Sequence, residues 1–319
     1  MTGVVGGVAG TVVGGVPRRV GILGAGRMGA GIAHAFLLAG AQVAVVERDA
    51  DTASAGRARI VAAIRESVAR QTTPETESEL AARLTVGTDV AVCAGAGLVV
   101  EAVAEDFVVK AELLGRAEAA VRSGSSGSGS GSGSGDAWLA SNTSSLSISD
   151  LAATLARPER FCGLHFFNPV PASELVEIVV GSATLPTLVE AARGWVTAIG
   201  KQSIVVTDSP GFASSRLGVA IGLEAIRMLE DGVASAADID TAMVLGYRFP
   251  VGPLRLTDMV GLDVRLGIAE YLHETLGERF EPPRLLRELV AKGSLGRKTG
   301  QGFFAWPAEP NRPDERPMP

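Results

Sequence analysis

"RRVGILGAGRMGAGIAHAFLLAG", residues 18–40, contains the pattern that decides the fold of this chain. Its first seven residues form a short apolar run with β-branched side chains, which is typical of a buried strand in a parallel sheet. A glycine-rich turn follows, and the residues after the turn have a helical pattern that stops at Gly40. Residues 42–48, QVAVVER, indicate a second strand. Strand, turn, helix and strand in this order predict the start of a doubly wound α/β sheet.

Gly24, Gly26 and Gly29 have the GxGxxG spacing of a dinucleotide-binding turn. The spacing alone is a weak signal in a chain with 40 glycines, but here a predicted strand precedes it and a predicted helix follows it. In such a turn the first glycine permits the tight bend, the second lets a pyrophosphate approach the backbone, and the third lets helix and strand pack closely. Unpaired N–H groups at the start of the helix would bind the phosphates.

Glu47 ends the second predicted strand, 23 residues after Gly24. A carboxylate at this distance can accept hydrogen bonds from both ribose hydroxyls of the dinucleotide. It also repels a 2′-phosphate, so the sequence favours NAD over NADP. Arg48 keeps NADP open, because an arginine beside this site can bind that phosphate.

The rest of the chain predicts two domains of different class. Strands alternate with helices as far as DSPGF, residues 208–212, and the pattern beyond is helical. We therefore expect a disordered tail over residues 1–17, a Rossmann-like doubly wound domain over 18–208, and an all-helical C-terminal domain over 209–319. Residues 123–135 alternate glycine with serine and cannot bury a core, so we expect a flexible surface loop within the first domain.

Composition narrows the range of partners and locations. The chain of 319 residues has a net charge of −6 and no basic tract, which argues against nucleic acid or an anionic membrane surface as a partner. Its first sixteen residues are rich in glycine, lack a positive start and are too short to span a membrane. Cys93 and Cys162 have no disulfide or metal-ligand spacing, so we expect no metal site. These features together predict a soluble, cytoplasmic protein.

His165 lies in GLHFFNPVPASELVEIVV, residues 163–180, and Glu177 follows it after twelve positions. A lone histidine in an apolar segment is most often a packed residue whose ring nitrogens are satisfied. The alternative is a general base, since an imidazole titrates near neutrality and a nearby carboxylate stabilises its charged form.

Seven motifs, in this order, resemble those of the L-3-hydroxyacyl-CoA dehydrogenase family, most closely its short, single-function 3-hydroxybutyryl-CoA type. The resemblance spans roughly residues 18–306. The motifs are GAGRMGAGIA, VVEAVAEDFVVKAELL, SNTSSLSIS, GLHFFNPVPASELVEIV, DSPGF, DIDTAM and RKTGQGFF.

The resemblance implies NAD-linked oxidation of a 3-hydroxyacyl thioester to the 3-ketoacyl thioester, or the reverse. It makes His165 the catalytic base and Glu177 the acid that pairs with it. Ser144, the first serine after Thr143, falls on a hydroxyl near the substrate oxygen. Asn168 falls on a residue near the nicotinamide and the substrate carbonyl.

Further positions follow from the same resemblance. Glu105, Lys110 and Lys298 match family positions on the cofactor side of the cleft. Ser215 stands where the family commonly has an asparagine that helps hold the substrate oxygen, so we expect altered substrate geometry or rate there. In this family the helical domain contributes to the substrate cleft and mediates formation of a homodimer. The resemblance also implies that the substrate is an acyl-CoA.

Two other functions stay open at this point. One is a related dehydrogenase acting on a carrier-protein-bound or free 3-hydroxy acid, such as a sugar acid, which the serine at 215 makes more credible. The other is a non-catalytic NAD-binding protein, against which the intact His165 and Glu177 pair argues.

Overall fold

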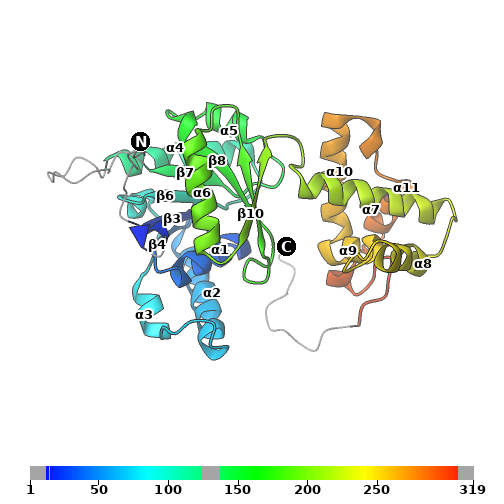
Figure 1. The fold of residues 1–319 in the computed structure, drawn as a ribbon, viewed down its shortest axis with the longest axis horizontal. Coiled ribbons are helices and arrows are strands. Elements are labelled where there is room, and N and C mark those ends of the chain that lie inside the picture. Colours follow the sequence, from blue (N-terminus) through cyan, green and yellow to red (C-terminus); the bar gives the residue numbers. More distant parts are fainter. Residues whose placement is uncertain (1–11, 14, 124–136, 308–319) are drawn as a thin grey trace, which may run out of the picture. The chain divides into compact units, whose positions relative to one another are not determined.

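The computed structural model describes residues 12–13, 15–123 and 137–307. The chain divides into two compact units after Ser209, one residue beyond the expected end of the first domain (Figure 1). Each unit is described by itself. The Gly/Ser segment expected to be a loop lies outside the described residues, except for Ser123, which ends a helix.

The first unit contains a mixed sheet. Within the described residues it has eight strands, in the order β10-β9-β8-β7-β6-β3-β4-β5. Neighbouring strands are parallel except for β8 and β9, which are antiparallel. The strands are β3 (Arg19–Leu23), β4 (Gln42–Val46), β5 (Leu84–Gly87), β6 (Leu98–Glu101), β7 (Trp138–Ser141), β8 (Phe161–Phe166), β9 (Leu175–Val180) and β10 (Gln202–Thr207).

The antiparallel pair departs from the expected all-parallel sheet. The connection between β8 and β9, residues 167–174, contains no helix. Parallel neighbours need a crossover of about a dozen residues or more, whereas antiparallel neighbours need only a short turn. The chain therefore reverses direction here, and the two strands face each other as a hairpin.

Helices cover both faces of this sheet. The β3–α1–β4 unit runs toward one edge and the β6–α4–β7 unit runs toward the other, so right-handed crossovers place α1 and α4 on opposite faces. α1 and α6 pack into one hydrophobic core with the strands. The helices are α1 (Arg27–Leu38), α2 (Ala50–Ala69), α3 (Glu77–Ala82), α4 (Phe107–Ser123), α5 (Ile148–Ala153) and α6 (Pro186–Ala198), with 3₁₀ turns η1 (Val90–Cys93) and η2 (Pro158–Arg160).

The end of the predicted disordered tail is ordered instead. β1 (Val12–Val13) pairs with β2 (Val16–Pro17) in an antiparallel manner. Val16 is fully buried in the core that contains α1 and α6. An apolar residue so close to the first strand of the sheet has core surface within reach, which is why the expectation is wrong for these residues. Residues 1–11 and 14 lie outside the described part.

The second unit is helical in its described residues apart from two isolated bridges near its end. Buried Asp258 accepts hydrogen bonds from the backbone N–H groups of Phe303 and Phe304 and from the indole of Trp306, which holds the final segment in place. The elements are α7 (Ser214–Glu230), α8 (Ala236–Thr241), η3 (Ala242–Gly246), α9 (Pro253–Val260), α10 (Leu262–Leu276), η4 (Glu278–Phe280), α11 (Arg284–Ala291) and η5 (Arg297–Thr299). None of the helices in the described ranges is long and apolar enough to span a membrane.

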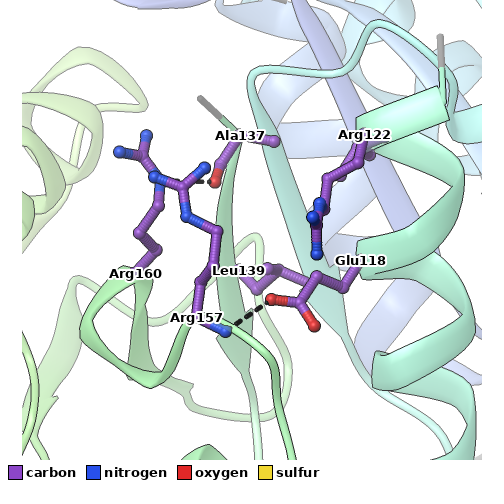
Figure 2. A pocket seen from close by; sticks show the side chains of 7 residues that line it. Glu118, Arg122, Ala137, Leu139, Arg157 and Arg160 are labelled. Carbon is purple, nitrogen blue, oxygen red and sulfur yellow. Dashed lines mark hydrogen bonds between the residues drawn. The ribbon is translucent and has the colours of Figure 1, made fainter. Parts of the chain in front are cut away.

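A small pocket lies where β7 and β8 begin (Figure 2). The Glu118 carboxylate accepts from the backbone N–H groups of Ala156 and Arg157 there, and the Arg160 guanidinium lies 3.8 Å above the Trp138 ring. These contacts join α4 to the amino ends of the two strands. The pocket therefore lies at the amino ends of the strands, opposite the carboxyl ends where ligands bind in such folds. Its lining residues are Glu118, Val121, Arg122, Ala137, Leu139, Arg157 and Arg160.

Candidate active site

The glycine-rich turn between β3 and α1 has the geometry that its spacing predicts. Gly24 has a φ of +92°, a left-handed conformation that side chains rarely adopt. A Cβ on Gly29 would lie 1.9 Å from the carbonyl oxygen of Gly24, so only glycine allows this helix to pack against the turn. Gly26 caps α1 without a side-chain hydrogen bond, and a Cβ there would meet nothing within 4 Å. The helix N-terminus is therefore open to a phosphate group.

Glu47 follows β4 and reaches the same turn. Its carboxylate accepts a hydrogen bond of 2.5 Å from the backbone N–H of Ala25. The neighbouring Arg48 is exposed and pairs instead with Asp49, at 3.0 Å, beside the start of α2. The Glu47 carboxylate is thus held against the turn, as a site for an unphosphorylated ribose requires. The Arg59 guanidinium contacts the same turn from α2 and donates to the carbonyl of Ala25.

His165 and Glu177 are brought together by the antiparallel strands β8 and β9. The strand register pairs these two residues directly, so their side chains lie on the same face of the sheet. His165 Nδ1 lies 2.7 Å from a Glu177 carboxylate oxygen, with side-chain exposures of 5% and 0%. The ring of Phe167 lies 4.6 Å from the imidazole and forms part of its apolar surroundings. A buried imidazole paired with a buried carboxylate is an arrangement that can move a proton.

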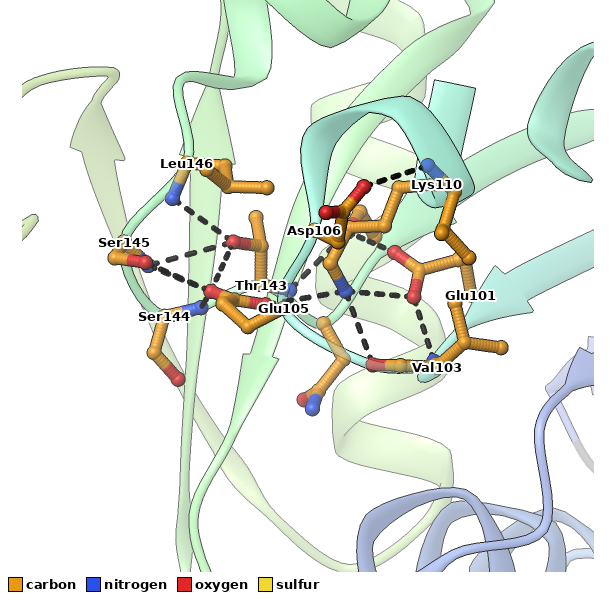
Figure 3. Close-up of polar contacts among 12 residues, drawn as sticks. Glu101, Val103, Glu105, Asp106, Lys110, Thr143, Ser144, Ser145 and Leu146 are labelled. Carbon is orange, nitrogen blue, oxygen red and sulfur yellow. Dashed lines mark hydrogen bonds and ion pairs between the residues drawn. The ribbon is translucent and has the colours of Figure 1, made fainter. Parts of the chain in front are cut away.

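Ser144 lies in a turn that follows β7, and the Glu105 carboxylate organises this turn. One oxygen of Glu105 accepts from the Thr143 hydroxyl at 2.6 Å, from the backbone N–H groups of Ser144 and Ser145 at 2.9 and 3.1 Å, and from the Ser145 hydroxyl at 2.9 Å. Figure 3 shows the Ser144 side chain pointing away from this carboxylate. Glu105 therefore fixes the backbone of Ser144, and the Ser144 hydroxyl is directed away from Glu105.

The pKa of Glu105 reflects these contacts. Burial by itself raises the pKa of this carboxyl, but the Lys110 ammonium and the Thr143 and Ser144 donors outweigh burial, so the pKa is lower than usual. Glu105 is thus ionised at neutral pH, which is the form that binds the turn.

The Lys110 ammonium lies among internal acceptors. Its side chain is 1% exposed, and its Nζ lies 2.7 Å from Glu101 and 3.1 Å from Glu105. A third contact, of 3.3 Å, goes to the carbonyl of Val103. The ammonium therefore contacts three acceptors of the protein itself. Of these, Glu105 is the one that also binds the Ser144 turn.

The sequence does not predict that three further residues belong to this region: Glu101, Ser141 and Asn142. Glu101 is fully buried and accepts from the Val103 N–H at 2.6 Å and from the Ser141 hydroxyl. Asn142 accepts a hydrogen bond of 2.9 Å from the backbone N–H of Phe166, next to His165. A charged residue closing an otherwise apolar strand was the available signal for Glu101.

Asn168 is exposed in the connection that leaves β8. The turn after it is held by Lys201, whose Nζ donates to the carbonyls of Val170, at 2.6 Å, and Ser173, at 2.5 Å. The two remaining expected site residues belong to the second unit. Ser215 lies half-buried in the first turn of α7, and exposed Lys298 pairs with Asp263 at 2.6 Å.

The candidate site residues of the first unit thus lie at the carboxyl ends of its strands. Gly24 follows β3, Glu47 follows β4, Glu101 closes β6, and Ser144 follows β7. His165 lies one residue before the end of β8. Ligands of open α/β sheets bind outside these strand ends, at the point where the strand order reverses. A glycine-rich turn at a helix N-terminus, an acid after the second strand and a buried histidine–carboxylate pair at the same ends of the strands are the features of a dinucleotide-dependent oxidoreductase.

Comparisons with known proteins identify the family. The model of the 3-hydroxyacyl-CoA dehydrogenase NAD-binding domain matches residues 19–209, and that of the family's C-terminal domain matches residues 211–306. The chain therefore belongs to the 3-hydroxyacyl-CoA dehydrogenase family, as the seven motifs indicated, and its cofactor is NAD.

Individual relatives are of the short, single-function type. A 3-hydroxybutyryl-CoA dehydrogenase of Mycobacterium tuberculosis is 40% identical over 292 residues, which are 91% of this chain and 98% of the relative. The mitochondrial hydroxyacyl-coenzyme A dehydrogenase of Sus scrofa is 36% identical and covers 91% of each chain. The crystal structure of (S)-3-hydroxybutyryl-CoA dehydrogenase from Ralstonia eutropha superposes with a TM-score of 0.82 at 36% identity, covering 91% of this chain and 99% of that one.

Proposed function

We propose that this chain oxidises the C3 hydroxyl of a short 3-hydroxyacyl-CoA to the ketone, and catalyses the reverse, with His165 as general base and acid and Glu177 as its partner. The observation that carries the proposal is the buried contact of 2.7 Å between the imidazole Nδ1 and the carboxylate. Family membership supports the reaction class, and the names of the relatives support a short acyl chain.

NAD, when bound, supplies the acceptor for the hydride that leaves C3. His165 removes the hydroxyl proton, because an imidazole near neutral pH is well matched to this task. Glu177 faces Nδ1, so the proton on Nδ1 is held by the carboxylate and Nε2 is the nitrogen that takes up the substrate proton. The carboxylate also balances the charge of the imidazolium that forms in an apolar environment.

Ser144 and Asn168 contribute to the binding of the substrate oxygen in this proposal. The Ser144 hydroxyl donates to that oxygen as charge develops on it during reduction, which is the role of an oxyanion-type donor. Glu105 supports the role, because it fixes the backbone of the Ser144 turn without engaging the Ser144 hydroxyl. Ser215 and Lys298 are the proposed contributions of the second unit to substrate and cofactor, respectively.

We also propose a cytoplasmic homodimer formed through the second unit. Support comes from the family resemblance, in which the helical domain forms the dimer, and from large apolar side chains that this unit exposes and an interface would cover. They include Leu217, Val233, Leu245 and Tyr247, each more than 60% exposed. Light scattering coupled to size-exclusion chromatography should give twice the mass of 32.7 kDa. A single-chain mass at micromolar concentration would contradict the dimer.

A substrate screen tests the proposed activity. Acetoacetyl-CoA with NADH should be turned over, whereas the same substrate with NADPH should react far more slowly, because Glu47 repels a 2′-phosphate. The screen should include a carrier-protein thioester and free 3-keto acids, such as those derived from sugar acids. If only these substrates react and acetoacetyl-CoA does not, the related dehydrogenase is the correct function. Absence of turnover with every substrate, together with measurable NADH binding, would indicate the non-catalytic alternative.

A further inference from the structure

Three buried or half-buried charges lie together at the carboxyl end of β6. The Lys110 ammonium lies between the Glu101 and Glu105 carboxylates, at 2.7 and 3.1 Å (Figure 3). Glu101 and Lys110 are almost completely shielded from solvent, whereas the Glu105 side chain is 39% exposed. Two carboxylates share one ammonium, so the Glu101–Lys110–Glu105 cluster carries one net negative charge.

The strand register places this cluster beside the cofactor-binding turn. Glu101 pairs with Leu23 of β3, the residue before Gly24, and with Ser141 of β7 on its other side. Because β3, β4 and β5 extend toward one edge while β6, β7 and β8 extend toward the other, the strand order reverses between β3 and β6. A dinucleotide binds across such a reversal, with one nucleotide over each half of the sheet.

The half of the sheet that contains the cluster is the half for the nicotinamide. Glu47, at the end of β4, is the acid suited to the adenosine ribose. The other nucleotide then lies over β6, β7 and β8, where His165 is found. Glu101 and Glu105 belong to this second half, so their net charge acts on the nicotinamide ring more strongly than on the adenosine.

We propose that the Glu101–Lys110–Glu105 cluster weights this crevice toward the oxidised cofactor. The nicotinamide ring of NAD⁺ carries a positive charge, and the ring of NADH does not. A fixed negative charge that is largely shielded from water therefore stabilises bound NAD⁺ relative to bound NADH. The inference rests on NAD binding and not on the proposed catalytic role of His165.

Glu101 is the member of the cluster whose charge can be removed with the least change of shape. Its oxygens accept from the Val103 N–H, the Ser141 hydroxyl and Lys110. A glutamine at position 101 has the same size and keeps an oxygen for the Val103 N–H. Lys110 then pairs with Glu105 alone, so Glu101→Gln brings the net charge of the cluster to zero.

The test is the ratio of two dissociation constants, Kd for NAD⁺ divided by Kd for NADH, measured at one pH and one salt concentration. For Glu101→Gln the ratio should rise by roughly three- to tenfold over wild type, the size expected of one unit charge acting across several ångströms of partly shielded protein. A purely structural role of Glu101 would change both constants by the same factor and leave the ratio unaltered.

Two matched controls separate charge from shape and from distance. Ser141→Ala removes a hydrogen bond to Glu101 without altering charge, so it should leave the ratio at the wild-type value. Glu118→Gln removes a buried carboxylate near the amino ends of β7 and β8, far from the strand ends where the cofactor binds. This variant should also leave the ratio unchanged. A shift of the ratio in either control as large as that in Glu101→Gln would contradict the proposal.

A ratio for Glu101→Gln within about 1.5-fold of wild type would overturn the proposal, because a unit charge several ångströms away in a shielded site should have a larger effect. If Glu101→Gln does not fold, Glu105→Gln at the more exposed end of the cluster serves instead. Its side chain is 39% exposed, so the rise should be at the lower end of the range, about threefold, and the same criterion applies. Both constants are measured without turnover. The ratio is therefore informative even if His165 is not the catalytic base, so failure of this proposal and failure of the proposed function can be told apart.

Discussion

The first unit contains two buried acid–base contacts that look alike and are built differently. His165 and Glu177 are direct neighbours on the antiparallel strands β8 and β9, so a single register determines their distance of 2.7 Å. Lys110 and Glu101 have the same separation of 2.7 Å, but one residue lies on α4 and the other on β6. Glu101 also binds Ser141, and through Lys110 it reaches Glu105 and the Ser144 turn.

The difference indicates what each contact can do. An imidazole changes its charge near neutral pH, so the pair on the hairpin can take up and release a proton. The cluster instead pairs one ammonium with two carboxylates through contacts between α4 and β6, which suits a fixed field and a fixed turn. Removing a residue of the first contact should therefore affect turnover, and removing a residue of the second should affect stability and cofactor binding.

The largest expected effect is on the hairpin pair. His165→Gln should lower kcat for acetoacetyl-CoA by about 10²–10⁴, since loss of a general base costs this much. NADH binding, measured by fluorescence titration, should stay close to wild type. The double variant His165→Gln/Glu177→Gln should be no slower than His165→Gln alone, because residues that act as a unit are not additive. A single variant that keeps more than about a tenth of kcat would refute the role of His165.

Lys110→Met should mainly affect stability. The substitution leaves Glu101 buried without its ammonium, and breaking a buried ion pair on one side typically costs about 3–5 kcal/mol of unfolding free energy. Chemical denaturation of the variant and of wild type measures the difference. Lys292→Met, at an exposed position in the second unit, is the control and should change the unfolding free energy by less than about 0.5 kcal/mol. Equal values for the two variants would show that the cluster contributes no more than a surface lysine.

These two contacts also show how far the sequence alone could lead. The β3–turn–α1 unit was predicted because its signals are local: an apolar run, glycines at fixed spacing and a helical pattern within residues 18–40. His165 and Glu177 could be paired through the resemblance, although the antiparallel hairpin that joins them was not foreseen. Its signal was a connection between the strands too short for a crossover helix.

The charged cluster could not be assembled in the same way. Glu105 and the Ser144 turn are 39 residues apart in the chain, and nothing in the spacing says that one binds the other. Lys110 matches a family position on the cofactor side of the cleft, which does not say what its ammonium contacts. Only the fold shows that its ammonium points inward to Glu101. Contacts between elements depend on packing, which sequence periodicity does not contain.

A smaller effect is expected in the pH dependence of stability. The pKa of Glu105 is lowered in the folded protein, so its ionised form stabilises the fold above its ordinary pKa of 4.5. This contribution disappears as the pH falls below 4.5 through the folded-state value. Glu105→Gln lacks it, so the unfolding free energy of the variant should fall less steeply than that of wild type between neutral and acidic pH. Parallel curves would show that Glu105 binds the turn without gaining from its charge.

The smallest and most specific effect concerns Ser215, which tests whether the hairpin pair receives the substrate that the family handles. In the proposed function, position 215 faces the oxygen of the acyl group, where the family commonly has asparagine. Asparagine reaches further than serine and offers an NH₂ donor, and a well-placed hydrogen bond to a charged oxygen contributes about 1.5–3 kcal/mol. Ser215→Asn should therefore raise kcat/KM for acetoacetyl-CoA, or leave it unchanged where the added atoms do not align. A fall of more than about tenfold, about 1.4 kcal/mol, in a variant that stays folded would mean that Ser215 belongs to a pocket shaped for another substrate. The carrier-bound or free 3-hydroxy acid would then be the better substrate, while the proton transfer assigned to His165 and Glu177 would stand unchanged.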